Sequence, residues 1–135
     1  MTDFNAMIEA LVACDTAKVT SLVNDALAQN IPAVEILNKG LIAGMDIVGE
    51  KMENGDMFIP EVLMAAKAMA GCVATLKPLL GEGESVTGAS VVIGTVKGDL
   101  HDIGKNHVSM MMESAGMEVH NIGVDISPEE FVTQI

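Results

Sequence analysis

Residues 90–106 read SVVIGTVKGDLHDIGKN, an uncharged run followed by a polar loop. Residues 89–96 are small or β-branched, a composition typical of a strand that is buried on both faces. Residues 104–115 then follow the pattern of a helix, in which we expect Val108, Met111 and Met112 to face inward. A strand, a loop and a helix in this order predict the first unit of a parallel α/β sheet.

The chain after this helix repeats the same order of elements. Gly116 ends the helix, and residues 117–122 are predicted to form a second strand. Ser127, Pro128 and the two glutamates that follow indicate a helix start, because they supply an N-cap, a first-turn proline and first-turn acids. The alternation predicts the beginning of a Rossmann-like, doubly wound sheet.

Such a sheet usually has about five strands, and only two are predicted here. We therefore expect residues 90–135 to be the N-terminal part of a Rossmann-like domain, truncated before its C-terminal strands, in a polypeptide that is a fragment. The first strand would keep an open edge, through which copies of the chain could form an oligomer.

The first 80 residues have helical spacing throughout. Asp15 is the predicted N-cap of a second helix. Apolar positions 34, 37, 41, 45, 48 and 52 predict a third helix that stops at Asn54. Positions 62, 66, 69, 73, 76 and 80 predict a fourth, which begins near Pro60. Four helices with short breaks predict a four-helix bundle over residues 1–81, followed by a glycine-rich linker over residues 82–89.

Charge and composition exclude several classes of function. The chain has 19 acidic and 7 basic residues, and its net charge of -12 argues against nucleic acids and anionic membranes as partners. We find no signal peptide and no stretch with the apolar length of a membrane span. Cys14 and Cys72 form no CxxC motif, which argues against a thiolate zinc site. A disulfide between them stays an alternative, but Cys72 lies within a helical pattern, so we expect buried free thiols and a cytoplasmic protein.

The loop over residues 97–103 follows the first strand, where α/β sheets bind ligands. Asp99 can accept a hydrogen bond from one imidazole nitrogen of His101, which fixes the tautomer and makes the other nitrogen a better metal donor. Gly98 and Gly104 remove side chains, so that a bulky flat ligand could approach the backbone. One histidine ligand by itself suits a metal that a macrocycle already holds.

Other interpretations of this loop remain open. A phosphate-binding loop would need GxxxxGK[ST], whereas five residues separate the glycines here and Asn106 stands where Ser or Thr is required. A zinc site would need three or four ligands, and His107 and His120 are not at a known spacing. A receiver domain would need a phosphoacceptor after a third strand. In the simplest alternative, His101 only caps the helix that starts near Gly104.

Two stretches resemble a known family. DLHDIG at residues 99–104 matches the DxHxxG motif of cobalamin-binding proteins, and TVKGDLHDIGKN at 95–106 is similar to the cobalamin-binding module of methionine synthase. It is equally similar to the corrinoid proteins of methylamine and methanol methyltransferase systems. VGEKMENGDMFIPEVLMAAKAM at 48–69 looks like the helical cap that precedes the motif in these proteins.

The resemblance implies a role for each matching position. His101 would be the lower axial ligand of cobalt, in place of the dimethylbenzimidazole of the cofactor, and Asp99 would tune its basicity. Gly104 would let the displaced nucleotide tail pass. Apolar residues of the cap would lie over the upper face of the corrin. The residues implied to contact cobalamin are Met52, Ile59, Val62, Gly98, Asp99, Leu100, His101, Asp102, Ile103 and Gly104.

One departure from the family bears on affinity. The SxL and GG motifs that line the tail pocket in these proteins would lie beyond residue 135, so we expect this chain to bind cobalamin weakly or not at all. Met52 and Val62 also lie on the predicted buried stripes, where they would serve as ordinary core residues.

The resemblance further implies a corrinoid carrier rather than an enzyme. The carrier would exchange a methyl group between a substrate-specific methyltransferase and a second methyltransferase that acts on tetrahydrofolate or coenzyme M. A reductive activase would be a third partner. The alternative is a cobalamin-dependent sensor, which would normally be fused to a basic DNA-binding domain, and a helical bundle that serves only as an interaction module is a further alternative.

Overall fold

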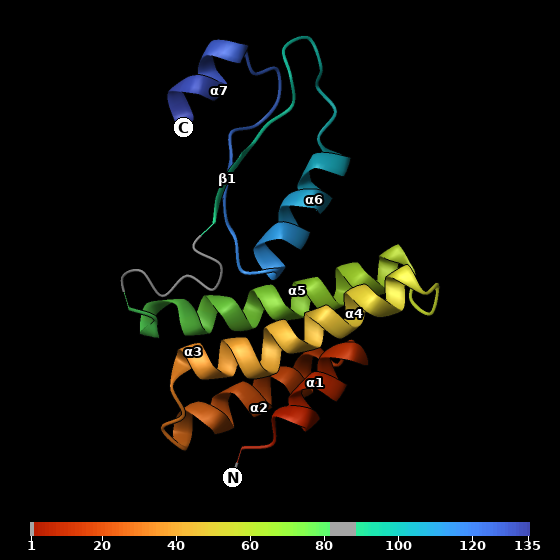
Figure 1. Cartoon of the computed structure of the whole chain (residues 1–135), viewed down its shortest axis with the longest axis vertical. Helices are drawn as coiled ribbons and strands as arrows, with labels where there is room; N and C mark the ends of the chain where they lie inside the picture. The colour runs from red at the N-terminus through yellow and green to blue at the C-terminus, as the bar shows by residue number, and fades with distance from the viewer. Residues whose placement is uncertain (1, 82–88) are drawn as a thin grey trace.

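The computed structural model of the chain describes residues 2–81 and 89–135. Helices make up the N-terminal part, and a small α/β unit follows (Figure 1). The elements are α1 (Phe4–Val12), α2 (Thr16–Ala28), α3 (Ala33–Glu35), η1 (Ile36–Ile42), α4 (Ala43–Glu53), α5 (Ile59–Leu76), η2 (Lys77–Leu79), β1 (Ser90–Ile93), α6 (Ile103–Ser114), β2 (Glu118–Asn121) and α7 (Pro128–Gln134). The linker expected over residues 82–89 lies outside the described residues, except for residue 89.

The first two helices begin at aspartate N-caps. The carboxylate of Asp3 accepts a hydrogen bond from the backbone N–H of Ala6 at 3.1 Å, and that of Asp15 accepts from Lys18 at 3.0 Å. Each bond satisfies a backbone donor that the first turn of a helix leaves without a partner. The predicted cap at Asp15 is therefore confirmed.

The third predicted helix forms, but not as a uniform α-helix. A π-helical segment, η1, lies between α3 and α4. Gly40 and Gly44 let this helix approach α1, because a Cβ built on Gly40 would lie 2.3 Å from Met7 Sδ and one on Gly44 would lie 2.8 Å from Leu11 Cδ2. The predicted apolar stripe is buried at Leu37, Leu41 and Val48. Ile36, Gly40 and Gly44 are buried in addition.

The central helix of the molecule is α5. It begins with Pro60 in its first turn, as predicted, and Glu61 accepts a hydrogen bond from the backbone N–H of Phe58 at 2.9 Å. Figure 1 shows α5 between the other helices of the bundle and α6, and α5 contacts α1, α2, α4 and α6. Its buried residues are Val62, Ala65, Ala66, Ala68, Met69, Cys72 and Leu76.

One expectation about membrane spans was wrong. Within the described residues, Ile59–Leu79 forms a helix of 21 residues with a mean hydropathy of 1.4, which has the length and composition of a span. A core helix of a globular protein meets the same criterion. Here the apolar side chains of α5 supply the centre of the bundle core, together with Met7, Leu11 and Leu41.

The α/β unit contains two parallel strands. Ser90 pairs with Glu118 and Ile93 with Asn121, and a further parallel bridge joins Val96 to Ile126. This arrangement confirms the predicted strand–helix–strand order. At α7, the predicted N-cap Ser127 accepts a hydrogen bond from Glu130 at 3.3 Å.

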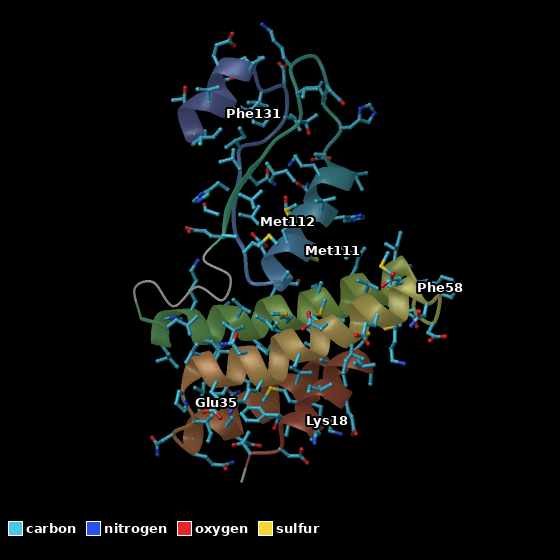
Figure 2. All side chains as sticks on the ribbon, in the orientation of Figure 1. Lys18, Glu35, Phe58, Met111, Met112 and Phe131 are labelled. Atoms are coloured by element: carbon cyan, nitrogen blue, oxygen red, sulfur yellow. The ribbon has the colours of Figure 1, made fainter. Side chains whose placement is uncertain are left out.

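The inward face predicted for α6 was wrong in part. Val108 and Met111 are 45% and 38% exposed, whereas Ser109 and Ser114 are buried. Both serine hydroxyls donate to backbone carbonyls one turn earlier, at 3.0 Å and 2.8 Å, so these small residues can be buried with their hydrogen bonds satisfied. Figure 2 shows Met111 and Met112 at the end of α6 that lies nearest α5.

Candidate functional site

The candidate site is the loop between β1 and α6, residues 97–103, which we call the motif loop. It follows the carboxyl ends of the parallel strands, as predicted. Its central residue is His101, whose side chain is 97% exposed. A histidine this exposed at the end of a sheet is free to contact a ligand.

Asp99 and His101 form a close pair. Oδ1 of Asp99 accepts a hydrogen bond from the backbone N–H of His101 at 2.9 Å and lies 2.5 Å from His101 Nδ1. The short contact is satisfied when Nδ1 carries the proton and donates a hydrogen bond to the carboxylate. Nε2 then keeps its lone pair and faces away from the bond, which is the arrangement of a histidine metal ligand.

Two of the alternative interpretations lose support. Among the residues that the structure describes, no group of three or more His, Cys, Asp or Glu side chains could hold a metal ion, which is the ligand set that a zinc site needs. The N-cap of α6 is Asp102, and the imidazole of His101 bonds to Asp99 instead. His101 therefore does not cap the helix.

The pKa of Asp99 is held below its usual range. The main cause is the hydrogen bond from the backbone N–H of His101, and the bond from the imidazole adds to it. Both bonds favour the ionised carboxylate. The stabilisation that Asp99 gives the folded loop is therefore present above the ordinary pKa of a carboxyl group and is lost as the pH falls through the lowered value.

This cause can be tested by NMR titration of the Asp99 carboxyl carbon in the cofactor-free protein. We expect a midpoint below that of an unperturbed aspartate. In His101→Ala the midpoint should rise but stay below the usual range, because the larger cause, the backbone N–H, remains. A complete return to the usual value would show that the imidazole dominates instead.

The glycines of the motif leave open space on the loop. Gly98 has a φ of +86°, a conformation that side chains other than glycine rarely adopt, and a Cβ at Gly98 or Gly104 would meet no atom within 4 Å. Protein atoms therefore do not fill the region next to either backbone. A flat ligand could approach the chain at both positions.

Exposed apolar side chains lie next to this space, and others lie on the helical bundle. Leu100 and Ile103, on either side of His101, are 73% and 72% exposed. On the helical bundle, Phe58 and Ile59 are 69% and 57% exposed. Figure 2 shows Phe58 at the turn between α4 and α5, which lies on the same side of the view in Figure 1 as the start of α6. Apolar exposure of this kind marks a surface that a ligand or partner covers.

The three predicted residues of the upper face differ in burial. Ile59 is exposed, Met52 is half-buried, and Val62 is only 1% exposed in a small cluster with Val48 and Met57. Val62 is thus placed as a core residue, and its contact with a cofactor stays a prediction. Sequence reasoning missed Phe58, although it is one of only three phenylalanines and directly precedes Ile59.

Comparisons with known proteins place the chain in a family. A B12 binding domain of one type matches residues 4–77, and a B12 binding domain of a second type matches residues 89–135. The dimethylamine corrinoid protein of Methanosarcina barkeri is 46% identical over 127 residues, which are 93% of this chain and 59% of that protein. The chain thus spans little more than half the length of this relative.

Solved structures agree with the sequence comparison. A cobalamin-binding protein from Desulfitobacterium hafniense superposes on 99% of this chain with a TM-score of 0.77 and 32% identity, and the match covers 63% of that protein. A chain of the methanol:cobalamin methyltransferase complex of Methanosarcina barkeri matches 97% of this chain, with a TM-score of 0.85 and 26% identity. The match covers 50% of that chain.

The residues of the site fit a corrinoid. A flat, largely apolar ring needs open backbone below it and apolar side chains around it, which the two glycines, Leu100 and Ile103 supply. Nε2 of His101 is exposed and oriented by Asp99, and is therefore suited to donate to a metal. The chain belongs to the B12-binding-domain family, as a relative of the corrinoid proteins of methyltransferase systems, and its cofactor is cobalamin or another corrinoid.

Proposed function

We propose that this chain is the cofactor-binding part of a corrinoid carrier, in which His101 is the lower ligand of cobalt. The observation that carries the proposal is the Asp99–His101 pair, whose imidazole is exposed and has one nitrogen fixed as a donor to the carboxylate. When bound, cobalamin supplies a cobalt centre that accepts and releases a methyl group.

The residues of the chain have separate tasks in this proposal. Nε2 of His101 would hold the metal, and Asp99 holds the imidazole in one tautomer by accepting a hydrogen bond from Nδ1. The glycines at 98 and 104 admit the ring and the displaced nucleotide tail. Asp102 lies next to His101 in the same exposed loop. Ile59, Met52 and Phe58 cover the upper face and keep water away from it.

The partners also belong to the proposal. A carrier requires a substrate-specific methyltransferase that loads the methyl group and a second methyltransferase that passes it to tetrahydrofolate or coenzyme M. A reductive activase would restore the cofactor after oxidation, and all of these would be cytoplasmic. Copies of the chain could associate through the open edge of β1. A molar mass of a dimer, measured by light scattering, would support this association. No feature of the described residues favours a sensor over a carrier.

Uptake of hydroxocobalamin tests cofactor binding by the chain. When the protein is titrated with the cofactor, the visible spectrum should shift from that of the free cofactor, at concentrations high enough for weak binding. Cobinamide, which lacks the nucleotide base, should bind as well, because the contacts proposed for Gly98, Leu100 and Ile103 are with the ring. If neither corrinoid stays with the protein even at high concentration, cofactor binding by this chain is refuted.

Methyl transfer then separates a carrier from a sensor. Protein loaded with cofactor is mixed with a methylamine methyltransferase and its substrate. Mass spectrometry then measures how much of the cofactor has been methylated. A carrier becomes methylated at a rate that depends on the concentration of the loaded protein. A cofactor that stays unmethylated with every methyltransferase tested would contradict the carrier.

A further inference from the structure

The loop between β2 and α7, residues 122–127, lies against the segment that leads into the motif loop. The backbone N–H of Thr95 donates to the carbonyl of Gly123 at 2.9 Å, and that of Ile126 donates to the carbonyl of Thr95 at 2.9 Å. Val96 and Ile126 continue this contact as a parallel bridge. The second loop is therefore fixed beside the first by backbone bonds.

Asp125 holds the motif loop at two points. Its carboxylate accepts a hydrogen bond from the backbone N–H of Gly98 at 2.7 Å, and its own backbone N–H donates to the carbonyl of Asp99 at 3.0 Å. Asp125 has a φ of +57°, a left-handed conformation that aspartate adopts more readily than most residues other than glycine. The two bonds enclose the peptide that joins Gly98 to Asp99.

Thr95 holds the same loop at a third point. Its hydroxyl donates to the backbone carbonyl of His101 at 2.7 Å. The backbone of Gly98, Asp99 and His101 is thus bonded to residues outside the motif loop. These are the residues that set where the carboxylate of Asp99 and the imidazole of His101 lie.

We propose that Asp125 and Thr95 are positioning residues that orient the Asp99–His101 pair before the cofactor binds. The inference rests on the proposed role of His101 as the lower ligand. An imidazole that is 97% exposed has little packing to fix its rotamer, so its direction depends on Asp99 and on the backbone that carries both residues. A ligand oriented in advance loses less conformational freedom on binding, which increases affinity.

Amide hydrogen exchange in the cofactor-free protein tests the bonds themselves. In Asp125→Ala the exchange of the Gly98 amide should accelerate about tenfold or more, because a hydrogen bond to a carboxylate is lost. Asp125→Asn keeps an acceptor oxygen and should accelerate it less. Glu129→Ala removes another exposed acid, on α7, and should leave Gly98 unchanged. Equal Gly98 exchange in Asp125→Ala and the wild type would overturn the proposal.

Cofactor binding tests the consequence. We expect Asp125→Ala to bind hydroxocobalamin about tenfold more weakly, within the range usual for residues that orient a metal ligand. Thr95→Val, which keeps the shape of the side chain and loses the hydroxyl, should weaken binding in the same direction. Asp125→Asn should restore an affinity near that of the wild type. At saturation, each variant should still show histidine bound to cobalt, because His101 is present.

The outcomes separate this inference from the proposed function. If the wild type binds the cofactor without histidine on the metal, the proposed function fails, and the inference fails with it. If the wild type has histidine on the metal and Asp125→Ala and Thr95→Val bind as tightly, the inference alone is overturned. Circular dichroism checks that each variant is folded. If Asp125→Ala is unfolded, Asp125→Asn and Thr95→Val test the inference instead, by amide hydrogen exchange and by affinity for hydroxocobalamin.

Discussion

Replacing His101 with alanine should remove the proposed lower ligand from the metal while leaving the fold intact. The side chain is 97% exposed, so its loss creates no cavity. Loss of a residue that only orients a metal ligand typically costs about 10–100-fold in affinity, and loss of the ligand itself should cost at least as much. We therefore expect the alanine variant to bind hydroxocobalamin far more weakly, with a visible spectrum that differs from that of the loaded wild type.

A matched control shows whether the effect is specific to His101 or follows from replacing any exposed histidine nearby. His107 is also exposed and lies six positions further along, within α6. We expect His107→Ala to keep both the affinity and the spectrum of the wild type. Identical behaviour of the two alanine variants would show that His101 is not the ligand.

Electron paramagnetic resonance of the reduced cofactor identifies the ligand directly. An axial nitrogen splits the cobalt signal, and the pattern depends on the nuclear spin of that nitrogen. Protein grown with isotope-labelled histidine and loaded with unlabelled cobalamin should show the changed pattern, and His101→Ala should lose it. A pattern that does not respond to the label would mean that the cofactor keeps its own base on the metal.

The sequence predicted the position of the motif loop because the signals are local. The uncharged run before residue 97, the glycines and the Asp99–His101 spacing all lie within one short stretch, and the structure has the loop where they placed it. Helix starts at Asp15, Pro60 and Ser127 were also predictable, since a cap depends on residues within one turn.

Features that depend on contacts between distant segments were not predictable in this way. Asp125 lies 27 residues from Gly98, and nothing in the pattern around residue 125 links it to the motif loop. Ile59 and Val62 are three positions apart at the start of α5, so helical spacing does not separate them. Val62 reaches the cluster around Val48, whereas Ile59 lies at the exposed beginning of the helix.

The π-helical segment is a further feature that the local sequence pattern did not predict. Apolar spacing predicted a continuous helix through residues 34–52, and the chain does stay helical there. The register changes over η1, where Gly40 approaches Met7 closely. Such a change depends on how two helices pack, which the spacing of apolar residues along one of them does not record.

The contact between α1 and α4 should contribute strongly to the stability of the helical bundle. Leu11 is fully buried, and its replacement by alanine should lower the free energy of unfolding by about 2–5 kcal/mol. In the wild type, Gly44→Ala should also destabilise, because the new Cβ would lie 2.8 Å from Leu11 Cδ2. Crowding a packed core in this way typically costs about 1–3 kcal/mol. Urea unfolding followed by circular dichroism measures both.

When Leu11 is already replaced by alanine, Gly44→Ala should raise the free energy of unfolding instead of lowering it. In Leu11→Ala the crowding Cδ2 is gone, and the remaining atoms lie at 3.4 Å and 3.6 Å, ordinary contact distances. Gly44→Ala should then stabilise the protein by about 1 kcal/mol, the usual gain from replacing a helical glycine with alanine. Gly49→Ala is the control on the same helix, because its Cβ would meet nothing within 4 Å. It should therefore have the same effect in both backgrounds.

The interaction between Leu11 and Gly44 should also affect how the protein retains its cofactor. α4 runs from its contact with α1 to a last turn that carries Met52, one of the residues proposed to cover the cofactor. If α1 and α4 pack as described, Leu11→Ala should weaken retention of the cofactor, and adding Gly44→Ala should recover part of it. Strictly additive unfolding energies for the two changes would mean that Leu11 and Gly44 do not touch in solution.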